Sequence, residues 1–133
     1  MSNNFSAKYR VYYEDTDAQR VMYYANYLKF AERARTDFLR DLNISQSGLM
    51  EKDNLLFVVK KCTIDYIAPA LLDDLIEVSV EVKSMSNTSL VLLQTFKRDE
   101  KILTTVEVLI VCVDAIAIRP KKIPEHIKIL LNV

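Results

Sequence analysis

The chain has 133 residues, half of them hydrophobic, and its 18 basic residues balance 18 acidic ones. A chain of this length can bury a core without disulfides or metals, so we expect a single domain over residues 1–133. The balanced charge, with no basic run among aromatics, argues against a nucleic-acid partner. No apolar run reaches the ~18 uncharged residues of a spanning helix, and the first residues do not resemble a signal peptide. We therefore expect a cytoplasmic protein with no membrane insertion.

The first third of the chain predicts one strand, an acidic turn and one long helix. Residues 5–13 mix aromatic and branched residues with polar ones, as a strand does. Glu14, Asp15 and Asp17 then form the turn. The predicted helix covers residues 24–42, about 19 residues or roughly 28 Å. Apolar residues at three- and four-residue steps form its expected buried stripe, namely Tyr24, Tyr27, Leu28, Ala31, Ala34, Phe38 and Leu42.

The remainder of the chain predicts strands joined by short turns. A loop with a short helical turn is expected around Gly48, the only glycine. The predicted strands span residues 55–67, 76–82, 90–96 and 102–118, and a short amphipathic helix spans residues 125–131. Strict alternation over 76–82 indicates one buried and one wet face, whereas 90–96 and 108–113 are apolar on both faces.

This order of elements predicts an α+β fold, an antiparallel sheet with one helix packed on one face. A single helix cannot cover both faces of strands that are apolar on both sides. Because a monomer rarely exposes so large an apolar surface, we expect self-association as a homodimer or homotetramer.

Several kinds of chemistry are disfavoured by composition. The only histidine, His126, lies in the last predicted helix and is expected at the surface, so a Ser-His-Asp or Cys-His site is improbable. Cys62 and Cys112 lie in apolar strand-like sequence and are expected to be buried thiols, and no cluster of metal ligands is apparent. One glycine cannot make a phosphate-cradling loop. We expect neither a metal nor a bound cofactor.

The acidic turn remains as the candidate site. The residues just after it, Arg20, Val21 and Met22, include no good helix cap, so the first amides of the helix would lack partners. Such amides favour an oxyanion, and a nearby carboxylate could serve as base or nucleophile. The alternative is that Asp17 itself caps the helix. Spacing alone leaves both open.

Three segments resemble a known family. The run YYEDTDAQRVMYYANYLKFAERARTDFLRDL closely resembles the opening of the hotdog-fold acyl-CoA thioesterases, especially the 4-hydroxybenzoyl-CoA thioesterase-like group with its Tol-Pal-associated members. The later runs LFVVKKCTIDYIAPALLDDLIEV and VLIVCVDAIAIRPKKIPEHI resemble that family's second strand and its last strand with the tail. The resemblance implies a five- or six-stranded antiparallel sheet wrapped around one helix, with active sites formed where two protomers pair.

The resemblance also implies roles for individual residues. Asp17 matches the catalytic carboxylate, as nucleophile or general base, and Tyr24 matches the position whose backbone amide holds the thioester oxygen. The resemblance also predicts which residues contact the acyl-CoA substrate, namely Arg20, Tyr23, Asn26, Tyr27, Lys60 and Lys61. Coenzyme A is part of this substrate and not a separate cofactor. The basic residues Arg119, Lys121 and Lys122 are further candidates for its phosphates, although solvated surface charge explains all five cations equally well.

The chain departs from the family at three positions. Gln19 and Arg20 replace a Gly-Gly pair, and Tyr24 replaces the histidine of the Tol-Pal-associated members. These departures keep an alternative open, a non-catalytic module that binds acyl thioesters or a partner protein. A dehydratase is a weaker third alternative, because no histidine lies near this helix. The expected function is hydrolysis of an acyl-CoA, or of an acyl-carrier-protein thioester.

Overall fold

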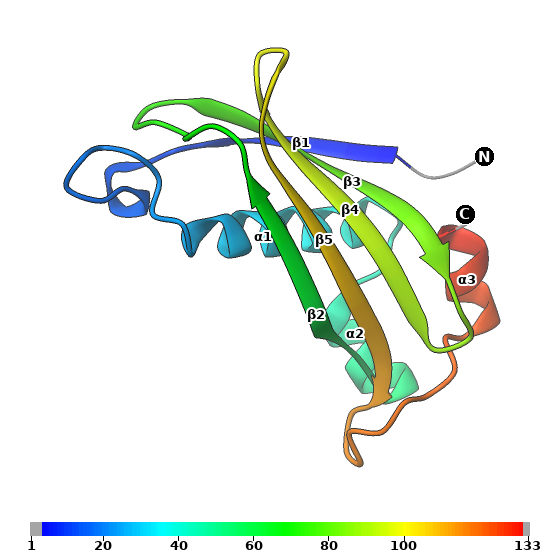
Figure 1. Cartoon of the computed structure of the whole chain (residues 1–133). Coiled ribbons are helices and arrows are strands. Elements are labelled where there is room, and N and C mark those ends of the chain that lie inside the picture. Colours follow the sequence, from blue (N-terminus) through cyan, green and yellow to red (C-terminus); the bar gives the residue numbers. More distant parts are fainter. Residues whose placement is uncertain (1–3, 132–133) are drawn as a thin grey trace.

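The computed structural model describes residues 4–131, in which an antiparallel sheet curves around one long helix (Figure 1). The five strands lie in the order β1-β3-β4-β5-β2. Their bounds are Asn4–Arg10 (β1), Leu55–Tyr66 (β2), Leu75–Met85 (β3), Ser89–Arg98 (β4) and Lys101–Asp114 (β5). The helical segments are η1 (Tyr13–Asp15), α1 (Asn26–Asp41), α2 (Gln46–Gly48), η2 (Leu49–Asp53) and α3 (Glu125–Leu131). The predicted antiparallel sheet with one long helix is therefore confirmed.

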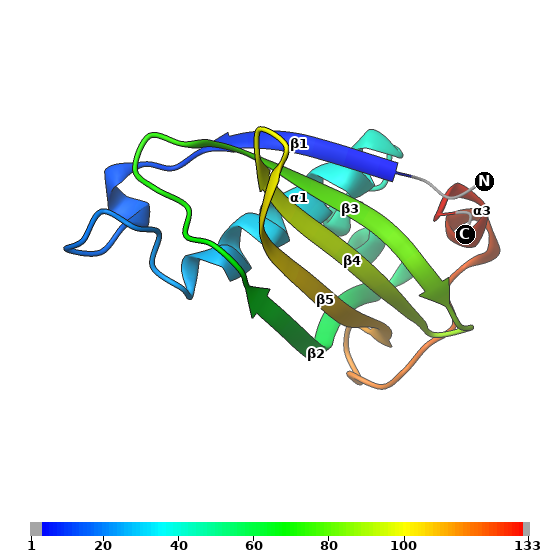
Figure 2. The same cartoon turned by 45° about the horizontal axis from the view of Figure 1, so that its top comes forward.

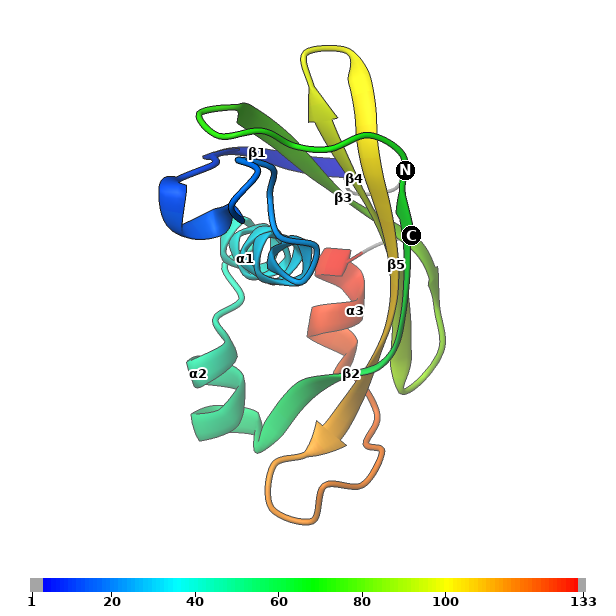
Figure 3. The same ribbon diagram turned by 60° about the vertical axis from the view of Figure 1, so that its left-hand side comes forward.

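The helix α1 lies in the concave face of the sheet, as the view along its axis shows (Figure 3). Its buried stripe consists of Tyr27, Phe30, Ala31, Ala34, Phe38 and Leu39. The small alanines let the helix backbone approach the strands. Figure 2 shows the segment before α1 projecting from one end of the molecule and α3 lying at the other.

The predicted helix start was wrong by two residues. The chain makes a turn over residues 23–25, and α1 begins only at Asn26. Tyr24 is consequently 63% exposed, and Leu28, on the flank of the helix, is 44% exposed. The prediction that both lie in the buried stripe is therefore wrong. A three- and four-residue spacing distinguishes neither a helix from the turn that precedes it, as at Tyr24, nor the centre of a helix face from its flank, as at Leu28.

The middle strands follow their predicted patterns. In β3, Ile76, Val78, Val80 and Val82 are buried, as the alternation predicted. In β4 and β5, every second residue faces α1 and is buried, whereas much of the opposite face is only half-buried. The strand predicted over residues 102–118 ends earlier, at Asp114, because its carboxylate accepts hydrogen bonds from the amides of Ile116 (2.9 Å) and Ala117 (2.7 Å) and turns the chain.

The strand β2 forms one edge of the sheet and is largely exposed. Its pairing with β5 is interrupted by a bulge between Val59 and Lys61. Cys62 lies on this edge and is exposed, so its predicted burial was wrong, whereas Cys112 on β5 is buried as predicted. Edge position depends on strand order, which local sequence does not encode. His126 is exposed on α3, as expected.

Two findings concern a membrane and a metal ion as possible partners. None of the helices within residues 4–131 is both long and apolar enough to cross a membrane. Over the same residues, His, Cys, Asp and Glu side chains nowhere gather in a group of three or more that could hold a metal ion.

Candidate active site

The acidic turn forms a small hairpin ahead of α1. The amide of Asp17 donates to the Val21 carbonyl at 3.0 Å, and the Arg20 amide donates to the Asp17 carbonyl at 3.0 Å. Arg20 has a φ of 65°, in the left-handed region that costs a side-chain-bearing residue about 1–2 kcal/mol. Glycine would adopt this φ without that cost.

The Asp17 carboxylate is exposed at the tip of this hairpin. Its Oδ1 accepts a hydrogen bond from the Gln19 amide at 2.8 Å. The residue before α1 is Ala25, and no side chain caps the helix. The alternative in which Asp17 caps the helix is therefore wrong. Among the described residues, its Oδ2 has no hydrogen-bond partner, so this oxygen is available to a substrate or water.

Asp15, two residues earlier, has a different environment. It is only 6% exposed, and its Oδ2 accepts from the Tyr12 amide at 2.8 Å. Its Oδ1 accepts from the side-chain amide of Asn26 at 2.9 Å, and Asn26 is itself buried. Asn26 thus fixes the start of the helix against the turn. This pair is not evident from the sequence, because nothing in the spacing of Asp15 and Asn26 marks them as partners.

The backbone amides just before α1 are a second feature of this region. Within residues 4–131, the amide nitrogens of Tyr24 and Ala25 have no acceptor at hydrogen-bonding distance. The carbonyl of Tyr24 accepts from the Tyr66 hydroxyl at 3.0 Å, which ties this segment to the end of β2. The Tyr23 amide donates to the Asp15 carbonyl at 2.9 Å. The two amides are thus free in a segment that is held on both sides.

An open hollow of about 310 Å³ adjoins these amides. Tyr27 forms its buried wall, with its ring 5.2 Å from the Tyr66 ring and 5.5 Å from the Phe96 ring. The other lining residues are Met22, Tyr24, Ile67, Ala68 and Pro69. Tyr24 and Tyr66 are exposed here, so the hollow has an apolar, largely aromatic surface.

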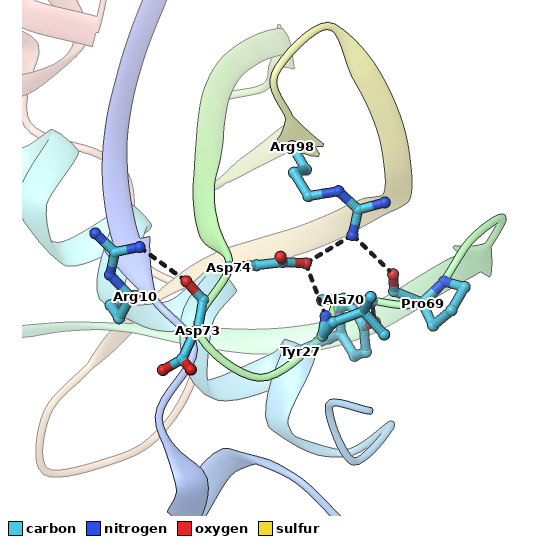
Figure 4. A network of polar contacts seen from close by, with 8 residues as sticks. Arg10, Tyr27, Pro69, Ala70, Asp73, Asp74 and Arg98 are labelled. Carbon is cyan, nitrogen blue, oxygen red and sulfur yellow. Dashed lines mark hydrogen bonds and ion pairs between the residues drawn. The ribbon is translucent and has the colours of Figure 1, made fainter. Parts of the chain in front are cut away.

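A neighbouring loop, residues 69–74, is bonded to the hairpin. Figure 4 shows this loop with its contacts to Arg10 and Arg98. The Met22 amide donates to the Ala70 carbonyl at 2.8 Å, and the Leu72 amide donates to the Arg20 carbonyl at 3.0 Å. The Tyr27 hydroxyl accepts from the Ala70 amide at 3.1 Å. Tyr27, predicted to contact substrate, is thus also part of the structural support.

A second cavity, of about 190 Å³, lies farther along the same gap between α1 and β2. Its walls are mostly apolar and include Phe38, Phe57 and Leu92. At its rim, Arg35 donates to the Gln94 side chain at 3.0 Å, and burial lowers the pKa of the Arg35 guanidinium. Arg35 lies eight residues along α1 from Tyr27, which is about 12 Å at 1.5 Å per residue.

The predicted phosphate-binding cations lie elsewhere in the chain. Lys60 and Lys61 are exposed in the middle of β2, and Lys61 lines a shallow hollow with Val91 and Leu109 on the sheet face turned away from α1. Arg119, Lys121 and Lys122 follow β5 at the end of the sheet opposite the hairpin (Figure 1). Lys121 donates to the Asp53 carbonyl at 3.0 Å. A single chain thus brings Asp17, Arg20, Tyr23 and Tyr24 together but not these cations.

Comparisons with known proteins give one family. The thioesterase-like superfamily model matches residues 11–131. "Acyl-CoA thioester hydrolase YbgC" of Escherichia coli O6:H1 is 49% identical over 119 residues, 89% of this chain and 88% of that protein. "Acyl-CoA thioesterase YbgC" of Haemophilus influenzae is 44% identical over 128 residues, 96% of this chain and 94% of that one. The solved structure of a probable thioesterase from Bartonella henselae, 30% identical, matches with a TM-score of 0.87 over 92% of this chain and 100% of that one. This likeness confirms the predicted hotdog fold.

Proposed function

We propose that this chain, which belongs to the thioesterase-like superfamily, hydrolyses the thioester bond of an acyl-coenzyme A. Water adds an oxygen to the acyl carbon, the carbon–sulfur bond breaks, and the products are a free acid and coenzyme A. The observation that carries the proposal is an exposed carboxylate on a hairpin beside unpaired amides at the start of α1. The two relatives named as acyl-CoA thioesterases support the choice of substrate.

Asp17 is the proposed catalytic residue. It either attacks the thioester carbonyl or removes a proton from the attacking water, and both roles need an unpaired carboxylate oxygen. The free Oδ2 supports this assignment, and the hydrogen bond from Gln19 to Oδ1 limits the rotation of the carboxylate. Asp15 is unsuited to either role because both of its oxygens already accept hydrogen bonds in a buried site.

The Tyr24 amide is the proposed oxyanion donor. The carbonyl oxygen gains negative charge as the tetrahedral intermediate forms, and a fixed amide beside it stabilises that charge. The Ala25 amide is a second donor in the same segment. Because the donors are backbone groups, replacement of the family's histidine by Tyr24 leaves this part of the mechanism in place.

The acyl chain is proposed to begin in the hollow beside Tyr27 and run along α1 as far as Arg35, at the near rim of the second cavity. The apolar lining of both spaces supports this path. Its length of about 12 Å suits a medium-length acyl chain better than an acetyl group.

Self-association through the edge of β2 is part of the proposal. This edge exposes Val58, Val59 and Tyr66, with Val59 49% exposed. An antiparallel copy would set the start of one β2 beside the end of the other. The Ala115 amide donates to the Asn54 carbonyl just before β2, so the loop after β5, which carries the basic residues 119–122, begins beside the start of β2. In the antiparallel dimer, this loop of one protomer would approach Tyr66 and Tyr24 of the other. This arrangement would supply Arg119 and Lys122 to the coenzyme A phosphates that one chain cannot reach.

A thiol-release assay across acyl-CoAs from acetyl to palmitoyl tests the function. We expect release of free thiol, strongest for medium chains that fill the α1–β2 gap. Acyl-carrier-protein thioesters with the same acyl groups serve as the comparison. Silence on every substrate would contradict hydrolysis and favour a module that binds thioesters without turning them over.

A further inference from the structure

We propose that the ion pair between Arg98 and Asp74 is a positioning device that holds the Asp17 hairpin through the 69–74 loop. The inference rests on the proposed role of Asp17 and adds two residues that neither line the hollow beside Tyr27 nor belong to the hairpin. Figure 4 shows Arg98 reaching from the end of β4 across the loop to Asp74.

The ion pair is short and partly shielded from water. The Arg98 Nη1 lies 2.6 Å from the Asp74 Oδ2, and their side chains are 28% and 16% exposed. The same Asp74 oxygen accepts the Leu71 amide at 2.8 Å, and the same Arg98 nitrogen donates to the Pro69 carbonyl at 3.4 Å. One guanidinium thus holds both ends of the segment from Pro69 to Asp74.

The segment that this pair holds is bonded to the hairpin. The Ala70 carbonyl accepts the Met22 amide, and the Arg20 carbonyl accepts the Leu72 amide. Between these two bonds, Val21 and Leu71 form an antiparallel bridge. The hairpin that carries Asp17 therefore continues as a strand-like pairing with residues 70–72, and a shift of those residues shifts the hairpin.

The second half of the loop has other supports. Asp73 donates its amide to the Val11 carbonyl at 3.0 Å, and Asp74 accepts the Val11 amide at 2.8 Å. The Arg10 guanidinium also donates to the Asp73 carbonyl at 2.8 Å. These bonds do not involve Arg98, so its loss would leave Asp73 and Asp74 attached to Arg10 and Val11 at the end of β1.

The first half of the loop depends on Asp74 and Tyr27. Three hydrogen bonds hold residues 70 and 71. The Leu71 amide donates to the Asp74 carboxylate, and the Ala70 amide donates to the Tyr27 hydroxyl. The Asp74 amide also donates to the Leu71 carbonyl at 3.0 Å, a backbone bond that does not involve Arg98. With Arg98 absent, the Asp74 carboxylate would be free to leave the Leu71 amide for water. The expected defect is thus local, in the pairing of residues 70–72 with the hairpin.

Misplacement of a catalytic group by about 1 Å can lower turnover as much as 10²-fold. Arg98→Met, which keeps most of the apolar stem, should lower kcat about tenfold and leave KM within about twofold, because neither residue contacts substrate. Arg98→Lys, which keeps one cationic donor, should restore part of kcat. Arg40→Gln, which removes an exposed ion pair with Asp37 on α1, is the matched control and should leave kcat unchanged.

Amide hydrogen exchange on the full chain gives the second readout. In Arg98→Met and in Asp74→Asn, the Met22 and Leu72 amides should exchange at least about tenfold faster, while the Val78 and Val80 amides of β3 keep their wild-type rates. Faster exchange at all four amides would mean general destabilisation and would overturn the proposal. Unchanged exchange at Met22 and Leu72 would also overturn it, as would a wild-type kcat in Arg98→Met.

The proposed function can fail separately. If the wild-type protein hydrolyses no thioester, hydrolysis at Asp17 is wrong, and a role of the pair in catalysis falls with it. The exchange measurement still decides whether Arg98 and Asp74 hold the hairpin.

Discussion

Asn26, the first residue of α1, donates a buried hydrogen bond of 2.9 Å from its side-chain amide to the carboxylate of Asp15. The bond joins the acidic turn to the start of the helix. It leaves Asp17, two residues farther along, exposed and outside the helix cap. The two acids thus have separate roles, with Asp15 positioning the backbone and Asp17 available for chemistry.

Loss of the Asn26 side chain should destabilise the fold. Asn26→Ala leaves a buried carboxylate oxygen of Asp15 without its donor, and a hydrogen bond to a charged group contributes about 1.5–3 kcal/mol. Urea unfolding should report a free energy of unfolding lower by about 2 kcal/mol. The matched control is Asn87→Ala. Within residues 4–131 the exposed Asn87 side chain accepts one hydrogen bond, from Lys128, and its loss should change the value by less than about 0.5 kcal/mol. Equal values for the two variants would show that the Asp15 bond adds no stability.

Replacement of Arg20 by glycine should remove the guanidinium charge and keep the backbone conformation of the hairpin. Glycine adopts a φ of 65° without strain, so Arg20→Gly should keep the hairpin and leave stability within about 1 kcal/mol. If the exposed guanidinium attracts coenzyme A phosphates, KM should rise several-fold at low salt with little change in kcat, and the effect should shrink as salt is added. An unchanged KM at low salt would remove Arg20 from the substrate-binding set.

Substitutions of Tyr24 test whether turnover is limited by the absence of a histidine at this position. Its side chain is exposed, its ring lies 4.8 Å from that of Tyr23, and a phenol is a poor base at neutral pH. Tyr24→Phe should change kcat only a few-fold, whereas Tyr24→His should raise it on short acyl-CoAs. Both variants retain the backbone amide. A collapse of kcat in Tyr24→Phe would instead make the phenol a catalytic group.

Much of the fold could be predicted from the sequence because its signals are local. Alternation gave the buried face of β3, and the helix Glu125–Leu131 lies where the amphipathic pattern placed it. The predicted burial of Cys62 was wrong, because Cys62 lies on an edge strand and the position of a strand in the sheet depends on strand order.

The candidate site was predicted only in part. Asp17 was a candidate because it precedes a helix whose first residues offer no cap, and the family resemblance assigned its role. The Asp15–Asn26 bond and the Arg98–Asp74 pair join residues 11 and 24 positions apart, so no local pattern shows them. The predicted start of α1 was wrong because Tyr24 matches the spacing of the apolar residues in the helix, although it lies in the turn before the helix.

The edge of β2 should determine the oligomeric state. Val59→Lys places a charge within the exposed apolar surface of this edge, and it should reduce a dimer or larger assembly to a monomer at micromolar concentration. The matched control is Ile129→Lys on α3, where Ile129 is exposed but remote from β2. Sedimentation velocity distinguishes the species. A wild-type protein that sediments as a 15.4 kDa monomer would contradict association through this edge.

The most direct test of the account is the turnover of Asp17→Asn on the acyl-CoA that the wild type hydrolyses best. Asparagine keeps the shape of the side chain and can still accept the Gln19 amide, but it cannot act as a carboxylate base or nucleophile. We predict a fall in kcat of roughly 10²-fold or more, with thermal stability close to that of the wild type. A variant that keeps the wild-type rate would contradict the assignment of Asp17 as the catalytic residue.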